Sequence, residues 1–563
     1  MLRVLLSSAT ALVLGLGVPS LAGAQSGSGA YLAGRSAAIG YDFDAAARYF
    51  SQALAHDRKN IALMESALVA QVSAGDLKRA APLAQMLILS GTKNRVAQMV
   101  LAAQAIQDGD FDTLADQDID APGIGNLVDH MARGWAQMGQ GRVRDALATF
   151  DSLAQQENLR SFVMFHKALA LASVGDFESA EHIFADTGNG VIQSRRVVLA
   201  RAQVLSQLGE NATAAAFLRE MFGAPHDPEL AQILAGLDAG QELPFDTIRS
   251  VQDGFAEVYY SVAGALQSET DPEYTLIFAQ IARELRPQNA DAILLVAELF
   301  EALEQYGPAI QAYKQVPPDD AAYHIAELGR AAALRKLGKP EAAVEVLEQL
   351  ARTHQDLGAV HSALGDAYRV LEDFAAATTA YDRALALRSD WFLYYARGIS
   401  HERLGNWPQA ETDFRAALDL NPDQPQVLNY LGYSLVEHRI KLDEALAMIE
   451  RAASASPDSG YIIDSLGWAL YRLGRYAEAV PHMERAAQLM AVDPVVNDHL
   501  GDVYWAVGRQ REAEFQWMRA LSFVDEDDPS AEADPDRIRQ KLAIGLDAVL
   551  QAEGAPPLRV AKD

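Results

Sequence analysis

The apolar residues of this chain recur at the spacing of amphipathic helices, and turns rich in Gly, Pro and Asp separate one predicted helix from the next. In the second half of the chain the pattern itself repeats, marked by a glycine that follows Leu or Arg. Intervals of 33, 34, 35 and 34 residues separate these glycines, which are Gly365, Gly398, Gly432, Gly467 and Gly501. Each interval predicts one helix, a short turn and a second, antiparallel helix.

The second helix of each predicted pair carries small and bulky residues at fixed places. Two alanines recur at a constant offset, as Ala479 and Ala486 do in the fourth unit. Between them stands one bulky residue, which in successive units is Tyr381, Phe414, Ile449, Met483 and Trp517. We expect the small residues to let the paired helices approach closely and the bulky residue to fill the space against the next unit. One pair cannot bury its apolar face alone, so the pairs must stack.

This frame resembles the tetratricopeptide repeat, a 34-residue helix pair with the pattern W-x2-L-G-x2-Y, then A-x3-F, A and P. Leu364 and Gly365 with Tyr368 match it closely, and the match recurs through the five units. The resemblance implies an all-α fold, a right-handed superhelical solenoid of stacked antiparallel helix pairs. It also implies that the first helices line the concave face and that ligands bind there.

The strength of the match predicts how the chain is divided. Residues 222–255 carry Pro and Gly at irregular intervals and are expected to separate an N-terminal from a C-terminal solenoid. After the acidic run 525–536, one apolar stripe predicts a single final helix that caps the stack. The predicted segments are a signal peptide at 1–24, degenerate helical repeats at 25–221, the connector at 222–255, divergent repeats at 256–357, five well-matched repeats at 358–527, and an acidic linker with the capping helix at 528–563.

The first 24 residues predict a cleaved secretory signal. Arg3 supplies a charged start, residues 4–18 are almost wholly apolar or small, and Ala22-Gly23-Ala24 matches an A-x-A cleavage site. An uncleaved membrane anchor is the alternative, but the apolar stretch is shorter than the ~20 residues that a spanning helix needs. We therefore expect the mature chain to start at Gln25 and to lie in the periplasm of a cell with two membranes.

Charge and composition exclude several classes of function. The chain has 47 Lys and Arg against 76 Asp and Glu, a net charge of -29, which disfavours binding to nucleic acid and to anionic lipid. It contains no cysteine, which excludes disulfides, thiolate catalysis, zinc sites of the Cys type and lipid attachment through Cys. No transmembrane segment is predicted after the signal.

Short patterns that could carry chemistry are incomplete. His401-Glu402 lacks the second His that a zinc helix needs, and Ser90 with Lys93 forms an S-x-x-K pattern in a predicted turn without its companion motifs. The acidic run 116–120 lacks the Gly and Glu of a calcium loop. We therefore predict a protein that is not an enzyme and that needs no metal or other cofactor.

Places that often contact ligands in tetratricopeptide repeats hold aromatic and acidic residues here. Carried over by resemblance, they predict a partner-binding strip on the concave face made of Tyr395, Asn429, Tyr433, Tyr461, Asp464, Trp468, Tyr471, Arg472, Asp498, Asp502 and Trp505. Aromatic residues and Arg anchor many protein interfaces. Packing against neighbouring helices is the alternative, although Leu466, Gly467 and Leu470 already give the helix of Trp468 a packing face.

These features predict a non-catalytic periplasmic scaffold or adaptor that binds a protein or an extended peptide. Residues 429–476 resemble units of bacterial envelope tetratricopeptide proteins, among them lipoproteins that act as adaptors for carboxyl-terminal processing proteases, although the lipid-bearing Cys of that group is missing. The resemblance implies that the chain presents clients to an envelope protease. Two alternatives stay open: an assembly factor for outer-membrane proteins or exported polysaccharide, and an enzyme with its site in the N-terminal half.

Overall fold

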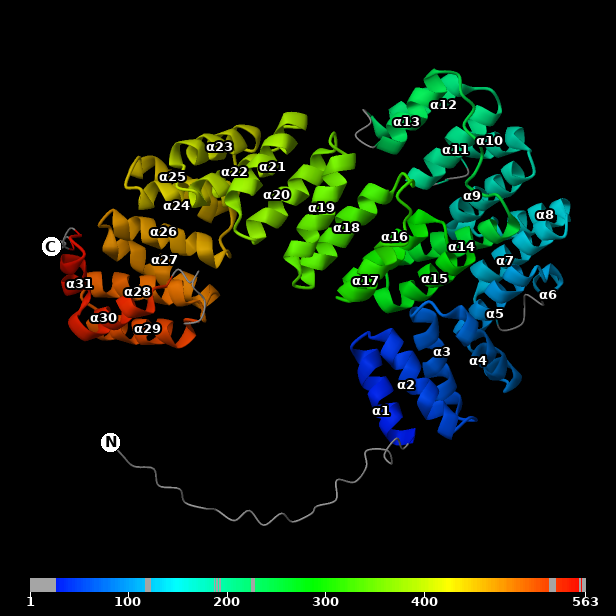
Figure 1. Ribbon diagram of the computed structural model, residues 1–563, viewed down its shortest axis with the longest axis horizontal. Helices are drawn as coiled ribbons and strands as arrows, with labels where there is room; N and C mark the ends of the chain where they lie inside the picture. Colours follow the sequence, from blue (N-terminus) through cyan, green and yellow to red (C-terminus); the bar gives the residue numbers. More distant parts are fainter. Residues whose placement is uncertain are drawn as a thin grey trace, which may run out of the picture. The chain divides into compact units, whose positions relative to one another are not determined.

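The computed structural model describes residues 27–116, 123–186, 188, 191, 194–223, 228–525, 533–555 and 558. Helices joined by short turns make up the structure, and none of these residues lies in a strand. The chain separates into two compact units, Met1–Lys339 and Pro340–Asp563, whose helices Figure 1 labels. Within each unit antiparallel helix pairs are stacked in chain order, so the expectation of an all-α solenoid is confirmed.

The helices of the first unit are α1 (Gly27–Ile39), α2 (Phe43–His56), α3 (Ile61–Ser73), α4 (Leu77–Leu89), α5 (Arg95–Asp108), α6 (Phe111–Ala115), α7 (Asn126–Gly139), α8 (Val143–Leu153), α9 (Glu157–Ser173), α10 (Phe177–Ala185), α11 (Arg195–Gln207), α12 (Asn211–Phe222), α13 (Pro228–Asp238), α14 (Val251–Leu266), α15 (Pro272–Leu285), α16 (Ala290–Ala302), α17 (Tyr306–Tyr313) and α18 (Tyr323–Lys336). Many begin at an Asp or Asn whose side chain accepts a hydrogen bond from a backbone N–H of the first turn, as Asp42 does from Ala45.

The helices of the second unit are α19 (Pro340–Thr353), α20 (Gly358–Val370), α21 (Phe374–Leu387), α22 (Trp391–Arg403), α23 (Trp407–Leu420), α24 (Pro425–Glu437), α25 (Leu442–Ala455), α26 (Gly460–Arg472), α27 (Tyr476–Leu489), α28 (Pro494–Ala506), α29 (Gln510–Phe523), α30 (Pro535–Ile544) and α31 (Leu546–Ala552). The first helices of neighbouring pairs pack against each other, α24 against α26 and α26 against α28. They therefore line the inner side of the stack.

Glycine and a bulky residue hold each regular pair together. A Cβ added to Gly398 would lie 2.7 Å from the Phe414 ring, and one added to Gly501 would lie 2.4 Å from the Trp517 ring. Phe414 also packs on Tyr430 of the next pair, with 5.2 Å between ring centroids. The bulky residue thus fills space within its own pair as well as against the next one, which corrects the simpler expectation.

In the first unit α14 and α15 lie on the inner side of the stacked pairs. α14 packs against α5, α7 and α9, and α15 packs against α3 and α5. Gly254 permits this approach, because a Cβ there would lie 2.4 Å from the Trp135 ring. Gln280 donates a hydrogen bond to the Ser73 carbonyl at 2.7 Å. We call α14 and α15 the internal helix pair.

The boundary between the units differs from the predicted one. The chain divides after Lys339, not within residues 222–255. Residues 239–250 are irregular but are tied into the first unit, because Gln203 of α11 accepts hydrogen bonds from the backbone N–H groups of Asp246 and Thr247. Arg286, at the end of α15, donates to the carbonyls of the same two residues.

The predicted capping helix is two helices. Gly545, with a φ of 82°, ends α30 and turns the chain into α31, and a Cβ there would lie 2.7 Å from the Trp505 ring. Ile538, Leu546 and Val549 are buried as their spacing predicted. The break places α31 so that Asp547 accepts a hydrogen bond from Trp505 at 2.8 Å.

Candidate functional site

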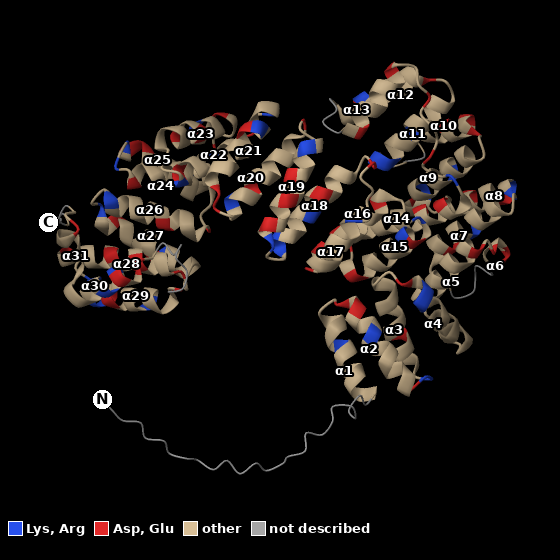
Figure 2. Cartoon of the chain, in the orientation of Figure 1, with Lys and Arg blue, Asp and Glu red and all other residues tan. Residues whose placement is uncertain are grey.

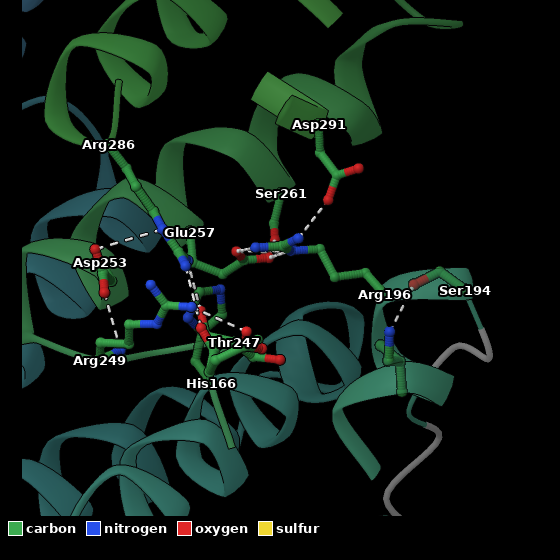
Figure 3. Close-up of polar contacts among 12 residues, drawn as sticks. His166, Ser194, Arg196, Thr247, Arg249, Asp253, Glu257, Ser261, Arg286 and Asp291 are labelled. Atoms are coloured by element: carbon green, nitrogen blue, oxygen red, sulfur yellow. Dashed lines mark hydrogen bonds and ion pairs between the residues drawn. The ribbon is translucent and has the colours of Figure 1, made fainter. Parts of the chain in front are cut away.

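A cluster of charged residues in the first unit surrounds the buried Glu257 (Figure 3). Arg196 of α11 pairs with Glu257 of α14 at 2.6 Å and with Asp291 of α16 at 2.5 Å. Burial opposes the charge of Arg196, but these carboxylates outweigh it, so the pKa of Arg196 is raised. The cluster joins the internal helix pair to its neighbours.

The groups around this cluster are committed to structural contacts. Burial, with a smaller contribution from the charge of Arg196, lowers the pKa of His166 to about 3. His166 therefore stays neutral, and its Nδ1 accepts a hydrogen bond from Trp135 Nε1 at 3.4 Å. No described group of three or more Asp, Glu and His residues, here or in the second unit, is placed to hold a metal ion. This cluster stabilises the fold and leaves no open site.

In the second unit the aromatic residues predicted as a binding strip lie together but are largely buried. Trp468 is 9% exposed and stacks between His499, with ring centroids 3.9 Å apart, and Tyr471, at 4.8 Å. Its Nε1 donates a hydrogen bond to Glu437 at 2.8 Å. Arg472 pairs with the same carboxylate at 3.2 Å. The expectation that Trp468 and Tyr471 form an open strip is corrected, since neighbouring helices cover both rings.

The acidic members of the strip are paired. Asp464 lies 3.0 Å from His499 Nδ1. Burial opposes protonation of His499, but Asp464 and, to a smaller extent, Asp498 and Asp502 outweigh it, so the pKa of His499 is raised. Lys541 of α30, itself 1% exposed, donates hydrogen bonds to Asp498 at 2.8 Å and to Asp502 at 2.6 Å.

The C-terminal helices therefore cover one end of the predicted strip. Asp502 also accepts a hydrogen bond from Trp517 Nε1 at 2.9 Å, and Trp505 donates to Asp547 of α31. A buried lysine side chain keeps its positive charge only where carboxylates lie beside it, and two carboxylates, those of Asp498 and Asp502, contact Lys541. Contacts with α30 and α31 thus take up the end of the inner face at α28.

The inner face remains open over α22, α24 and α26. Phe392 is 40% exposed and Tyr461 is 48% exposed, while Tyr395 and Tyr433 are half-buried. Burial, and to a smaller extent the nearby Tyr461, raises the pKa of Tyr395 to about 12. Asn429 of α24 is 7% exposed, and its Oδ1 has no hydrogen-bond partner among the described residues. We call this region of α22, α24 and α26 the open inner face.

Models of the tetratricopeptide repeat match residues 328–391, 395–460 and 461–490. The chain is a tetratricopeptide-repeat protein. The matched residues contain most of the open inner face, and repeats of this kind are protein-interaction scaffolds. Phe392, just beyond the end of one matched segment, belongs to α22 with Tyr395.

A relative and two solved structures resemble this tetratricopeptide-repeat protein. TPR repeat-containing protein PA4667 of Pseudomonas aeruginosa is 30% identical over 187 residues, which are 33% of this chain and 31% of that relative. The APC/C hetero-tetramer Cut9-Hcn1 aligns with 91% of this chain and 96% of its own at 13% identity and a TM-score of 0.38. A tetratricopeptide repeat protein from Parabacteroides merdae aligns with 46% and 98% at 16% identity and a TM-score of 0.37. These TM-scores support no conclusion about function.

Charge is spread widely over the tetratricopeptide-repeat protein. Figure 2 shows Asp and Glu on most helices of both units, with Lys and Arg between them. No helix of the described chain is long and apolar enough to cross a membrane.

Several residues of the site were missed in the sequence. His499 stacks on Trp468, Tyr430 packs between two pairs, and Lys541 neutralises the acidic pair on α28. Lys541 carried a usable signal, because it falls three residues after Ile538 on the apolar stripe of the final helix. A charged residue on such a stripe indicates a buried partner of opposite charge.

Proposed function

We propose that this protein is a non-catalytic scaffold that binds an extended segment of a partner protein on the open inner face of α22, α24 and α26. The observation that carries the proposal is the exposure of two large aromatic side chains, Phe392 on α22 and Tyr461 on α26, which are 40% and 48% exposed. Exposed aromatic residues of this size commonly anchor a bound partner.

The chemistry of this face favours a polypeptide. Exposed Tyr and Phe side chains supply large apolar area at low entropic cost, and such residues dominate binding at protein interfaces. In the described part of the first unit, the internal helix pair covers the corresponding face of α3, α5, α7 and α9.

A scaffold differs from an enzyme with a hidden N-terminal site in one structural respect. A catalytic domain would interrupt the helix pairs before residue 255. The described residues of that region fold as successive helices, and Arg196 within it is paired with two carboxylates. These observations support the scaffold.

The proposed location is the periplasm, and the proposed role is presentation of clients to an envelope protease. Support comes from residues 1–24, which read as a cleaved secretory signal and lie outside the described residues. Intact-mass measurement of the exported protein tests the location, with a mature chain that starts at Gln25 as the expected result. A retained N-terminus would contradict it.

Site-specific photo-crosslinking tests the binding face. A benzoylphenylalanine placed at Phe392 or Tyr461 should capture the same protein from an envelope fraction, whereas one at Phe515 of α29, which is 59% exposed, should not. Tyr461→Ala should then weaken binding of the purified partner by about 10- to 30-fold, the loss typical of an anchoring aromatic residue. Equal capture at Phe515, or full affinity of Tyr461→Ala, would overturn the proposal.

A further inference from the structure

A cavity of about 750 Å³ lies in the second unit where the C-terminal ends of α19 and α21 meet the first half of α20. Figure 1 shows these three helices side by side. Leu364 and Leu387 supply apolar surface to the cavity, and Glu348, Arg352 and Arg383 supply charge. The volume lies within the range of pockets that hold small molecules. No residue of the open inner face lines this cavity, so it is a separate site.

Arg383 stands at a place where other regular repeats also carry an arginine. It follows the bulky residue of its repeat, Tyr381, by two residues. The bulky residues of the last three helix pairs are followed in the same way by Arg451, Arg485 and Arg519. The chain therefore offers three internal comparisons for Arg383.

In those three repeats the arginine is bonded to the turn that precedes its own helix pair. Arg451 pairs with Asp423 at 2.6 Å, and Arg485 pairs with Asp458 at 2.9 Å. The third arginine donates a hydrogen bond to the carbonyl of Ala491 at 2.9 Å. Each of the three thus links its helix to a neighbouring turn.

Arg383 lacks this link and lines the cavity instead. Its guanidinium makes no ion pair or hydrogen bond with any residue that the structure describes. Asp356 holds the place equivalent to Asp423, nine residues before the glycine of the repeat, but it neither pairs with Arg383 nor lines the cavity. The charge that the other repeats use to join a turn is therefore available to the cavity here.

On the opposite wall, Glu348 and Arg352 are four residues apart on α19 and do not pair. That spacing favours an ion pair, such as the one that a Glu and an Arg of α23 form at 2.8 Å. Here Glu348 Oε1 accepts a hydrogen bond from the Tyr368 hydroxyl at 2.6 Å, and Arg352 donates to the side-chain amide of Gln349 at 2.9 Å. The second oxygen of Glu348 accepts no hydrogen bond from a described residue. The cavity thus holds two guanidinium groups without a carboxylate and a carboxylate without a cation.

We propose that this cavity binds a phosphomonoester that carries hydroxyl groups, such as a sugar phosphate. A phosphomonoester has about two negative charges at pH 7 and three terminal oxygens, which match two guanidinium groups. Its hydroxyl groups donate to the free oxygen of Glu348, and its carbon skeleton packs on Leu364 and Leu387. No Phe, Tyr or Trp among the described residues lines the cavity, so the base of a nucleotide would lack the stacking partner that it usually has.

Isothermal titration calorimetry with the full-length protein tests the proposal. The probe is glucose 6-phosphate, compared with inorganic phosphate, which lacks the polyol, and with glucuronate, which has a carboxylate in place of the phosphate. We expect glucose 6-phosphate to bind at least ~10-fold more tightly than either, because each comparison compound loses hydrogen bonds to charged groups. Equal binding of inorganic phosphate would show a general anion site, and equal binding of glucuronate would show a site for any acidic sugar. Either result, or no binding of glucose 6-phosphate, would overturn the proposal.

Matched arginine variants locate the binding. Arg383→Gln should weaken glucose 6-phosphate by about 10-fold, and because Arg383 is exposed, its thermal unfolding curve should stay unchanged. Arg451→Gln is the control, since it removes the arginine at the same place of a later repeat, where the side chain pairs with Asp423 away from the cavity. Unchanged binding by Arg383→Gln, or an equal loss in Arg451→Gln, contradicts the assignment.

A variant of the carboxylate separates recognition of the hydroxyl groups from recognition of the phosphate. Glu348→Gln keeps an acceptor for the Tyr368 hydroxyl but removes the negative charge. It should weaken glucose 6-phosphate and strengthen inorganic phosphate, because the carboxylate accepts hydroxyl groups and repels a bare anion. A change of the same sign for both ligands would overturn the assignment of a hydroxyl-bearing ligand. These results are independent of the proposed function, which is read from Phe392 and Tyr461.

Discussion

The two units build the same helix pair and use its inner side in opposite ways. In the first unit α14 and α15 lie on the inner side of the stacked helices, and Phe255, Tyr259 and Ile281 are fully buried there. In the second unit Phe392 and Tyr461 are 40% and 48% exposed on the corresponding side. The repeat fixes where an inner face lies, whereas the segments that follow it determine whether the face is filled or free.

The residues of the helices at the two inner faces agree with this difference. Most residues of α14 and α15 are buried, and two of their buried polar residues have partners on other helices, as Glu257 has Arg196 and Gln280 has the Ser73 carbonyl. The helices of the open inner face are apolar toward their pairs and carry Tyr, Asn and Glu on the other side. A filled inner face adds stability to its unit, and an open one keeps binding groups available.

The largest expected effect is in the packing shared by both units. Ala479 of α27 is fully buried, so Ala479→Arg would place a charge in a close helix contact and lower the free energy of unfolding of the second unit by about 3 kcal/mol or more. Hydrogen exchange resolved along the sequence would measure this separately for each unit. Ala477→Arg is the control, since Ala477 is exposed on the same helix.

Unchanged exchange in residues 340–563 of Ala479→Arg would show that the helix register of these repeats is misassigned. Loss of protection in residues 27–339 as well would show that the two units unfold together.

A smaller effect is expected where the internal helix pair meets the first unit. Gly254→Ala would bring a methyl group to 2.4 Å from the Trp135 ring and destabilise the first unit by about 1–3 kcal/mol through overpacking. Gly264→Ala on the same helix is the control. No atom lies within 4 Å of a Cβ there, so this variant should gain up to about 1 kcal/mol from helix propensity. Thermal unfolding of both variants would check the difference.

Destabilisation by both variants would show that α14 tolerates no side chain at either glycine and that the Trp135 contact is not the cause. Stabilisation by both would show that α14 is not tightly held against α7, and the contrast between a filled and an open inner face would then fail.

The repeats were predictable because their small and bulky residues follow a fixed interval. Gly398 and Phe414 lie 16 residues apart and meet in space, and both positions recur in the other units. The internal helix pair was not predictable in this way, since its partners on α3 to α9 lie about eighty residues or more earlier in the chain and share no periodicity with it. The available signal was the run of apolar residues in α15, from Leu276 to Ala279.

The sequence predicted which residues make up the candidate site, but it did not predict which of them are exposed. Trp468, Tyr471 and Asp502 were selected because the repeat did not require them for packing, yet the first two are covered by neighbouring helices and the third by Lys541. Position within a repeat indicates which way a side chain points. It does not reveal that α30 will return to the same face, because that contact depends on one lysine outside the repeat.

The two units should respond to pH in opposite directions. His166 has a folded-state pKa of about 3 against about 6.5 when unfolded, so only the unfolded state takes up its proton between these values. Its stabilising contribution is complete above pH 6.5, and the first unit should lose about 2 kcal/mol between pH 7 and pH 5 relative to His166→Leu. Urea unfolding at the two pH values, read by hydrogen exchange at a single labelling pH, measures this.

His499 has a raised pKa, so its contribution to the second unit is present below about pH 6.5 and is lost as the pH rises through the folded-state value. His499→Gln should therefore cost more stability at pH 6 than at pH 9. The same sign of dependence for both histidines would contradict the contrast between a neutral, buried His166 and a His499 held beside carboxylates.

The smallest expected effect lies in the turns between paired helices. Arg439 follows α24 in the left-handed conformation with a φ of 56°, and Arg439→Gly should raise the free energy of unfolding of the second unit by about 0.5–1 kcal/mol, because glycine adopts this conformation more readily. Glu372 follows α20 at the equivalent place with a φ of 58°, so Glu372→Gly should give a similar gain. Denaturation curves of both variants measure the effect. A gain for Glu372→Gly alone would show that the side chain of Arg439 stabilises its turn through contacts of its own, whereas equal gains would show that both turns tolerate a side chain at the cost of a strained backbone.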